Sequence, residues 1–276
     1  MIYILLPVHN RKNVTEKFVN SLLAQTYRRF HLVLIDDGSL DGTDRMVKDK
    51  VPSCDVIRGK GDWWWAGALQ KGYEWVRDNA IPGEELILIV NDDTEMDSSF
   101  LERGAVAMRG KNNYMIHSYN TDRITGEALD SGVHVDWSKL SFRMTDDDRK
   151  INCFSTRGVF LSAGDFLKLG GFYPYLLPHC HSDYEFTIRA RRSGMRLLLD
   201  KELKLYMNEG TAEDEKLLKG RERTGRLNDI FSRKNPANPI EGTAFIILAC
   251  PWPWKLLNIM RIWHRAFIRK VANGSK

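Results

Sequence analysis

Four short apolar runs in the first hundred residues are the feature that most constrains how this chain can fold. They span residues 2–6, 31–35, 55–57 and 86–90, and the third is the weakest. Hydrophobicity within them is continuous rather than alternating, which is typical of strands buried on both faces of a parallel sheet. The runs therefore predict the core of a parallel or mostly parallel sheet.

Segments with helical spacing lie between these runs. Val14, Phe18 and Leu22 share one face of the first segment, where Asn13 and Glu16 form a capping-box pattern. A second amphipathic segment covers about residues 66–79, whereas residues 111–150 are polar and show little periodicity. The alternation of strands and helices predicts a doubly wound α/β domain, in which ligands bind beyond the carboxyl ends of the strands.

Polar residues follow three of the predicted strands directly, at residues 7–11, 36–39 and 91–94. Asp, Asn and Gly often make simple turns after strands. Three such ends at equivalent positions, however, bring two carboxylate pairs and a basic residue to one edge of the sheet. We therefore expect a polar ligand site at this edge.

Charge divides the chain into an acidic body and a basic end. Residues 1–215 contain 28 Lys and Arg against 33 Asp and Glu, whereas residues 216–276 contain 13 against 3. A basic segment of this kind attracts anionic partners. The sequence lacks the run of roughly 18–20 apolar residues needed for a spanning helix, the basic flank of a signal peptide, and any CxxC pair among its four cysteines. These features predict a cytoplasmic protein with reduced thiols.

The basic end contains a predicted amphipathic helix at residues 254–271. Its apolar face is formed by Leu256, Ile259, Met260, Trp263, Phe267 and Val271. Basic residues lie mostly elsewhere on the helix, an arrangement that suits an anionic membrane surface. Docking on the rest of the chain, or on a second subunit in a homodimer, is the alternative. Nucleic acid is disfavoured because the segment matches no known binding motif.

The strand-end motifs resemble a known family when they are taken in order. Residues 7–11, 25–27 and 34–43 closely resemble the opening of family 2 glycosyltransferases with the GT-A fold. Four later blocks match in the same order: residues 65–72 resemble the glycine-rich helix start, 91–93 the DxD-type metal motif, 170–192 the acceptor-side motif, and 233–235 the closing basic segment of bacterial polysaccharide, rhamnosyltransferase-like members. The chain departs from the family at Ser182, where Glu is usual, and at Asn208, where many members have His.

The resemblance implies a GT-A fold, which is a Rossmann-like doubly wound sheet, followed by a helical basic extension. Residues 1–215 would form the catalytic domain, with a nucleotide-sugar half to about residue 110 and an acceptor half from about residue 111. Residues 216–276 would form the extension. The family also implies Mg²⁺ or Mn²⁺ as the cofactor, and both ions prefer oxygen ligands.

The implied activity is inverting transfer of a hexosyl or deoxyhexosyl group from a nucleotide-sugar donor to a hydroxyl of a glycan or lipid-linked acceptor. The setting would be bacterial surface polysaccharide synthesis, on the inner face of the cytoplasmic membrane. Two alternatives remain. A non-catalytic nucleotide-sugar-binding subunit would be consistent with the departures at Ser182 and Asn208. A sugar-nucleotide pyrophosphorylase is disfavoured because residues 7–11 contain no glycine.

The family match also assigns roles to individual residues. Asp93 would contact the metal, although a helix N-cap before residues 98–108 is the alternative. Asp183 would accept the proton of the acceptor hydroxyl, while Glu185, about 200° away on a helix, would pair with Arg189. The implied donor-binding residues are Pro7, Val8, His9, Arg11, Asp37, Trp65, Gly67, Gln70 and Asp92. On the acceptor or phosphate side, the implied residues are Trp64, His181, Glu185 and Arg233, with Arg221, Arg223, Arg226 and Lys234 as further basic candidates.

Three further motifs have more than one interpretation. Residues 63–65 are consecutive tryptophans, which cannot all face a core, so at least one is expected to be exposed or to stack on a sugar or base. Coverage of the sheet edge by two of them is an equal alternative. Residues 179–181 resemble zinc ligands, but adjacent residues cannot readily chelate one tetrahedral ion, so we expect a loop beside the acceptor. Residues 146–148 are predicted to form a solvated acidic loop.

Overall fold

The structure is a computed structural model that describes residues 1–79, 85–207 and 230–274, with side chains up to residue 268. Asn208, Arg221, Arg223 and Arg226 lie outside the described residues, and so does the side chain of Val271. No helix in the described part of the chain is both long enough and apolar enough to cross a membrane.

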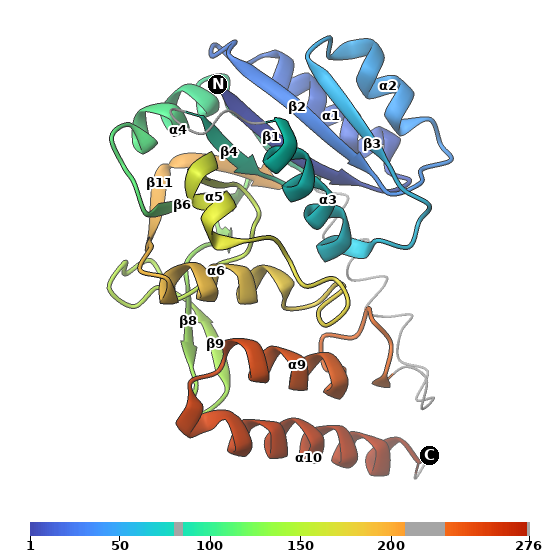
Figure 1. The fold of residues 1–276 in the computed structure, drawn as a ribbon, viewed down its shortest axis with the longest axis vertical. Helices are drawn as coiled ribbons and strands as arrows, with labels where there is room; N and C mark the ends of the chain where they lie inside the picture. Colours follow the sequence, from blue (N-terminus) through green and yellow to red (C-terminus); the bar gives the residue numbers. More distant parts are fainter. Residues whose placement is uncertain (80–84, 208–229, 275–276) are drawn as a thin grey trace.

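Nine of the described strands form one mixed sheet (Figure 1). The strand order is β3 (Cys54–Arg58), β2 (Phe30–Asp36), β1 (Ile2–Val8), β4 (Leu86–Ile89), β10 (Val159–Ser162), β6 (Tyr114–Asp122), β11 (Arg196–Met207) and β5 (Thr94–Met96), with β7 (Ala128–Asp130) beside β6. The first four strands in this order are parallel, and β10 is antiparallel to both of its neighbours. The four apolar runs are these parallel strands, so the predicted doubly wound fold is confirmed.

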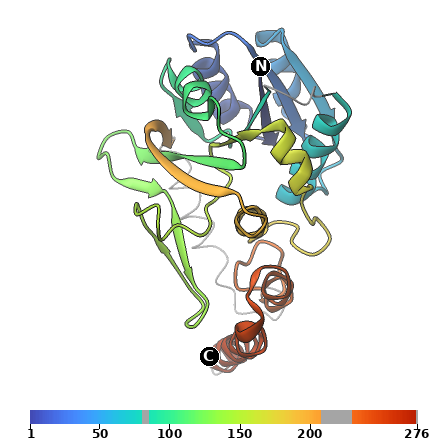
Figure 2. The same cartoon turned by 60° about the vertical axis from the view of Figure 1, so that its left-hand side comes forward.

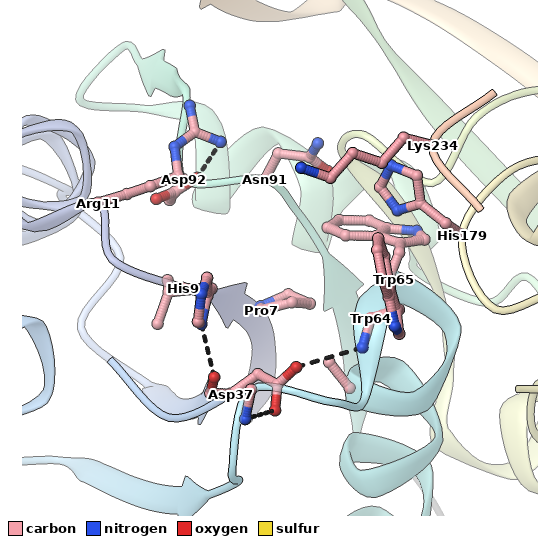
Figure 3. Close-up of a pocket in the computed structure, with 13 residues that line it drawn as sticks. Pro7, His9, Arg11, Asp37, Trp64, Trp65, Asn91, Asp92, His179 and Lys234 are labelled. Carbon is pink, nitrogen blue, oxygen red and sulfur yellow. Dashed lines mark hydrogen bonds and ion pairs between the residues drawn. The ribbon is translucent and has the colours of Figure 1, made fainter. Parts of the chain in front are cut away.

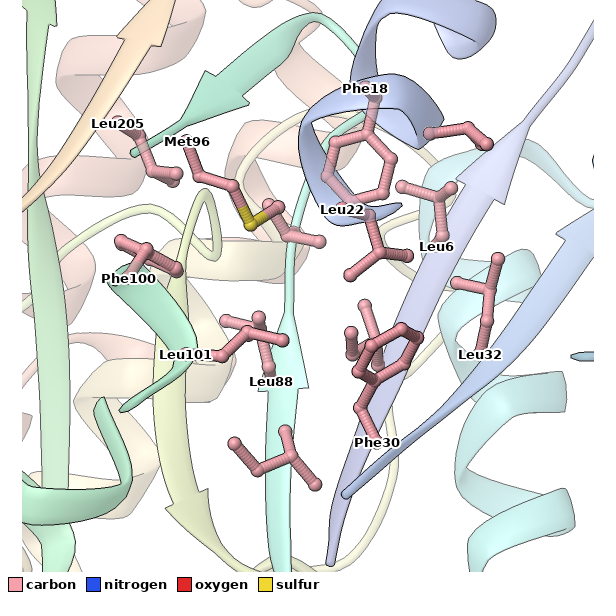
Figure 4. Close-up of a cluster of buried hydrophobic side chains, with 14 of the residues drawn as sticks. Leu6, Phe18, Leu22, Phe30, Leu32, Leu88, Met96, Phe100, Leu101 and Leu205 are labelled. Carbon is pink, nitrogen blue, oxygen red and sulfur yellow. The ribbon is translucent and has the colours of Figure 1, made fainter. Parts of the chain in front are cut away.

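Helices cover both faces of the sheet. α1 (Lys12–Leu23), α2 (Thr43–Lys50) and α4 (Phe100–Met108) pack on one face, and α3 (Trp64–Asn79), α5 (Ala163–Leu169) and α6 (Ser182–Arg192) pack on the other. Within β1, Ile4 and Leu6 join the first core cluster (Figure 4), while Leu5 joins the second. Because successive side chains of a strand point to opposite faces, both faces must be apolar, which explains the continuous runs.

The start of α1 differs from its prediction. The helix begins at Lys12 after Arg11, and Asn13 does not cap it. The backbone N–H of Lys12 instead donates to Asp41 Oδ2 at 2.9 Å, from the loop after β2. Glu16 pairs with Lys50 of α2 at 2.7 Å. A carboxylate from a neighbouring loop therefore replaces the local capping box, which sequence spacing alone cannot reveal.

Residues 111–150 contain much of the second half of the sheet despite their weak periodicity. β6 is largely buried, although it includes His117, Ser118 and Asn120. Ser118 Oγ and Asn120 Nδ2 both donate to the carbonyl oxygen of Arg157, at 3.3 and 3.1 Å. Because a distant backbone carbonyl accepts these two hydrogen bonds, a core strand can carry Ser118 and Asn120. The acidic residues 146–148 lie in a loop, as predicted, and Asp147 pairs with Arg149 at 3.0 Å.

The C-terminal part forms a helical layer below the sheet (Figures 1 and 2). α9 (Pro239–Ala249), the 3₁₀ turn η1 (Trp252–Trp254) and α10 (Lys255–Gly274) follow one another. α9 and the inner face of α10 pack with α6 and with the hairpin of β8 (Val133–Asp136) and β9 (Ser141–Met144) around a third apolar cluster. Asn258 Nδ2 also donates to the carbonyl oxygen of Trp137 at 2.9 Å.

α10 has two apolar faces, so the prediction that Ile259 shares one apolar face with Leu256, Met260, Trp263 and Phe267 is wrong. Ile259 and Ile262 pack inward on the third cluster. The outward apolar side chains, all exposed, are Leu256, Met260, Trp263 and Phe267. The helix therefore docks on the rest of the chain and still presents an apolar surface.

We expect Gly104→Ala to destabilise the fold because the new Cβ would lie 2.4 Å from the ring of Phe160 across the α4–sheet contact. Such overpacking typically costs about 1–3 kcal/mol of unfolding free energy. Gly164→Ala in α5 is the matched control, since no atom lies within 4 Å of its new Cβ. Urea denaturation should show a lower midpoint for the first variant only, and equal midpoints would contradict this packing.

Candidate functional site

A cavity of about 360 Å³ lies at the carboxyl edge of the parallel strands (Figure 3). Its lining comes from the ends of β1, β2 and β4, the start of α3, and two later loops. The residues are Pro7, Val8, His9, Arg11, Asp37, Gly61, Trp64, Trp65, Ala68, Asn91, Asp92, His179 and Lys234. All the predicted donor-binding residues except Gly67 and Gln70 therefore meet in one pocket.

Asp37 organises the loop on one side of this pocket. Its Oδ1 accepts the N–H of Gly61 at 2.8 Å, and its Oδ2 accepts those of Trp63 and Trp64 at 2.9 and 3.2 Å. Its carbonyl oxygen accepts His9 Nδ1 at 2.6 Å. These bonds hold the start of α3, where Trp64 adopts a left-handed φ of 57°. Backbone strain of this kind persists only where the surroundings enforce it.

Asp92 is a buried carboxylate at the end of β4. Its Oδ2 accepts the Thr15 hydroxyl at 2.8 Å, and its Oδ1 lies 3.2 Å from a guanidinium nitrogen of Arg11. Burial raises the pKa of Asp92 to about 6, although Arg11 opposes the shift. Arg11 thus compensates part of the cost of keeping this carboxylate ionised.

Asp93 follows Asp92 in the sequence and is 6% exposed. Its Oδ2 is 3.7 Å from Arg11 and 3.8 Å from Arg157. It precedes β5, and α4 begins only after Ser99, so the alternative of a helix cap at Asp93 is wrong. Asp93 is therefore positioned between two cationic side chains.

Oxygen atoms suited to a divalent cation are present at this strand end. Asp93 Oδ1 and Asn91 Oδ1 are buried, and neither has a hydrogen-bond partner among the described residues. The described part of the chain groups no three His, Cys, Asp or Glu side chains that could hold a metal by themselves. Mg²⁺ commonly binds through one or two carboxylates together with water and substrate phosphates. The residues present thus fit such an ion.

Asp183 lies on the first turn of α6. Its Oδ1 accepts the N–H of Tyr184 at 2.9 Å. Burial raises the pKa of Asp183 to about 6; the charge of Asp130 adds to this shift, and that of Arg157 opposes it. Arg157 therefore acts electrostatically on Asp183 and also lies beside Asp93.

Glu185, two residues further along α6, is held in a different contact. Its carboxylate pairs with Arg189 at 2.8 and 3.1 Å and is almost fully buried. Helical spacing predicts this pair. Because Arg189 occupies both oxygens of Glu185, Asp183 is the better placed of the two for proton transfer.

Sequence analysis missed the polar group behind Asp183. Asp130 on β7 accepts a hydrogen bond from the Ser155 hydroxyl, and His117 Nε2 lies 3.9 Å from the same carboxylate. Full burial lowers the pKa of His117. These residues, with Arg157, come from segments without a motif or clear period, and only the pairing of β6 with β7 and β10 brings them together.

His181 does not face the cavity, contrary to its predicted acceptor-side role. Its Nε2 lies 3.1 Å from the carbonyl oxygen of Pro236, and its ring stacks on Phe245 of α9. Arg233 lies over the ring of Trp64 at 5.9 Å, while Lys234 lines the cavity. The segment before α9 therefore adds two basic residues to this edge, besides Arg11.

Gly67 and Gln70 face another pocket, on the opposite side of α3. Helical geometry separates Trp65 from Gly67 by about 200°, so both cannot point into one cavity. Gln70 Oε1 accepts the N–H of Phe172 at 2.8 Å. Gln70 therefore contacts the loop after α5, and neither residue lines the first cavity.

Fold and site together define the class of the protein, which is that of the GT-A glycosyltransferases. The family model for glycosyl transferase family 2 matches residues 3–162, and the chain belongs to this family. None of the curated proteins compared with the chain matches it.

Three solved structures show the similarity of fold. The mannosyltransferase PcManGT from Pyrobaculum calidifontis, in complex with GDP-Man and Mn²⁺, has a TM-score of 0.60 at 16% identity, covering 97% of this chain and 75% of that one. S. aureus TarS 1–349 with UDP-GlcNAc gives 0.60 at 14%, covering 99% and 88%. GalNAc-T7 with UDP, GalNAc and Mn²⁺ gives 0.60 at 15%, covering 76% and 44%.

Proposed function

We propose that this protein is a metal-dependent, inverting glycosyltransferase that transfers a hexosyl or deoxyhexosyl group from a nucleotide-sugar to a hydroxyl of a glycan or lipid-linked acceptor. The observation that carries the proposal is that one cation, Arg157, lies 3.8 Å from the carboxylate of Asp93 and also acts electrostatically on Asp183. Structural neighbours in complex with GDP-Man, UDP-GlcNAc and Mn²⁺ support a nucleotide-sugar donor and a divalent ion. We place the reaction in bacterial surface polysaccharide synthesis.

On the donor side, the cavity between β1, β2 and α3 would hold the nucleoside. The aromatic face of Trp65 is available for stacking, and the backbone of residues 7–9 forms one wall. Asp92 would meet the ribose, and Asp93 with Asn91 would hold Mg²⁺ or Mn²⁺. When bound, the ion would neutralise charge that develops on the departing diphosphate. Arg11 and Lys234 add positive charge at the same edge.

On the acceptor side, Asp183 would remove a proton from the attacking hydroxyl. The hydroxyl oxygen forms a bond to the anomeric carbon as the bond from that carbon to the diphosphate oxygen breaks, and the proton passes to Asp183. Attack from the face opposite the leaving group inverts the anomeric centre. A carboxylate with a pKa near 6 remains ionised at neutral pH and is a stronger base than an ordinary aspartate.

The C-terminal layer would bind the enzyme to the inner face of the cytoplasmic membrane. Exposed apolar side chains on α9, η1 and α10 share this end of the molecule: Ile240, Ile247, Trp252, Leu256, Met260, Trp263 and Phe267. No carboxylate follows Glu241 in the sequence, and Arg265 is exposed on α10. Apolar side chains beside positive charge suit a surface of anionic lipids. Such a surface would place the enzyme beside a lipid-linked acceptor.

We expect Asp93→Ala to abolish the metal-dependent part of nucleotide binding. Calorimetry with UDP and GDP should show wild-type affinity rising about tenfold or more when Mn²⁺ is added, a change of about 1.4 kcal/mol. The variant should show the same weak affinity with and without the ion. Asp78→Ala, which removes an exposed carboxylate paired with Arg77, is the control. An undiminished Mn²⁺ effect in Asp93→Ala would exclude Asp93 from the metal site.

We expect Asp183→Asn to reduce transfer about 10²–10⁴-fold, the usual contribution of a positioned base. Binding of the nucleotide should stay within about twofold, because Asp183 does not line the donor cavity. The wild-type rate should rise with pH through about 6 and then level off, as the carboxyl ionises. Nucleotide binding without any turnover in the wild type would favour the non-catalytic subunit instead.

Stability provides the folding control for Asp183→Asn. The pKa of Asp183 is raised on folding, so the native state binds more protons than the unfolded state between about pH 4 and 6. The ionised carboxylate therefore lowers wild-type stability as pH rises through this window. The Asn variant should unfold at a higher temperature than wild type at pH 8 and lose that advantage below about pH 4. A less stable variant at pH 8 would contradict the raised pKa.

We expect the double variant Leu256→Ser with Phe267→Ser to bind vesicles containing phosphatidylglycerol at least about tenfold more weakly than wild type. Each substitution removes exposed apolar side-chain area that would otherwise pass from water into the membrane. Leu40→Ser with Ile124→Ser, which removes two exposed apolar side chains from distant loops, is the matched control. Co-sedimentation measures the difference, and equal binding by the two double variants would contradict the proposed membrane surface.

A further inference from the structure

The second pocket, about 780 Å³, lies between α3 and the loop of residues 171–178. Two hydrogen bonds, each donated by a backbone N–H group, connect the two ends of this loop to the helix. Phe172 N–H donates to Gln70 Oε1 at 2.8 Å, and Ala66 N–H donates to the carbonyl oxygen of Pro178 at 2.9 Å. The pocket opens between this loop and the helix, and both line it.

The loop is held rigidly from its other side as well. Arg189 of α6 donates to the carbonyl oxygens of Leu169 and Gly171 at 2.6 and 2.7 Å, and its guanidinium lies 4.9 Å from the ring of Tyr173. Phe172 stacks on Phe186 at 4.5 Å between ring centres. A wall fixed in this way is preformed, so a ligand would not have to order it on binding.

The lining combines flat rings with polar side chains. Trp63, Trp64, Tyr173 and Tyr175 supply the rings, and Tyr175 is 98% exposed. Gln70, Lys71, Glu74 and Arg233 supply hydrogen-bonding groups. Lys71 and Glu74 are paired with each other at 2.7 Å, so their charges balance. Pyranose rings have an apolar C–H face that packs on aromatic rings and an edge of hydroxyl groups that needs such polar partners.

The second pocket borders the donor cavity at one residue. Trp64 lines both, and Arg233 lies over its ring on the side of the second pocket. Figure 3 shows Trp64 and Trp65 beside His179 at the boundary of the donor cavity. A molecule in the second pocket would therefore lie next to a bound donor.

We propose that the pocket between α3 and residues 171–178 is a carbohydrate-binding groove that holds pyranose units of the acceptor glycan, an inference that rests on the proposed transferase function. Tyr175, which is 98% exposed, forms the stacking platform, and Lys71, Glu74 and Arg233 bind hydroxyl groups. The reactive end of the acceptor lies at Trp64, where the groove borders the donor cavity. We expect the groove to bind a chain of sugars more tightly than a single sugar.

The test uses saturation-transfer NMR on the full-length protein. The probes are methyl glycosides of glucose, galactose, N-acetylglucosamine and rhamnose, with maltotetraose and chitotetraose. Saturation of aromatic protons should transfer to at least one probe, more strongly for a tetrasaccharide. Tyr175→Ala should weaken that binding roughly two- to tenfold, which is the usual contribution of one aromatic contact. Trp252→Ala, which removes another exposed ring, should leave it unchanged.

Calorimetry with UDP, GDP and Mn²⁺ on the same samples separates the two proposals. Nucleotide binding that is intact in Tyr175→Ala, combined with weakened glycan binding, supports the groove. If a nucleotide binds but no probe does, or if Tyr175→Ala and Trp252→Ala weaken a probe equally, the groove is overturned and the transferase proposal stands. Failure of both nucleotides to bind would overturn the transferase proposal, and with it the acceptor role of the groove.

Discussion

Burial of the parallel strands on both faces is the constraint on which the rest of the structure depends. Leu5 packs toward α3 while its neighbours Ile4 and Leu6 pack toward α1, so the middle of β1 cannot carry a solvated polar group. The carboxylates of the site lie beyond the carboxyl ends of these strands, where the chain continues into loops. Asp37, Asp92 and Asp93 are collected at one edge for this reason, and the helices that cover the faces contribute mainly their amino-terminal turns to the site.

The site keeps several carboxylates in a buried setting, and the fold bears the resulting desolvation cost. Burial raises the pKa of Asp92 and of Asp183, which shows that the ionised form of each is disfavoured by its surroundings. Arg11 and Arg157 offset part of this cost without removing it. Groups destabilised in this way are common where chemistry is performed, because a fully satisfied carboxylate is a poor base and a poor ligand.

Local pattern was sufficient to predict the parallel strands, α3 and most of the residues that line the first cavity, because these depend on short apolar runs and the residues directly after them. Local pattern was insufficient wherever a segment distant in the sequence supplies the hydrogen-bond or packing partner. Asp41 replaces the predicted cap at Asn13, and His181 packs on α9 instead of facing the cavity. Asp130 and Arg157 have no sequence signal, since only sheet pairing brings β7 and the start of β10 near Asp183. Gly67 and Gln70 were misplaced because a motif does not specify which side of a helix each residue faces.

The position of Trp64 has a consequence for how this enzyme could evolve. Its ring forms part of both pockets, and its strained backbone is fixed by Asp37 rather than by either ligand. A substitution at this position changes the shape of two recognition surfaces at once. Under the proposed assignment of donor and acceptor to these two pockets, a lineage that adopts a new sugar by altering Trp64 would change its acceptor preference at the same step.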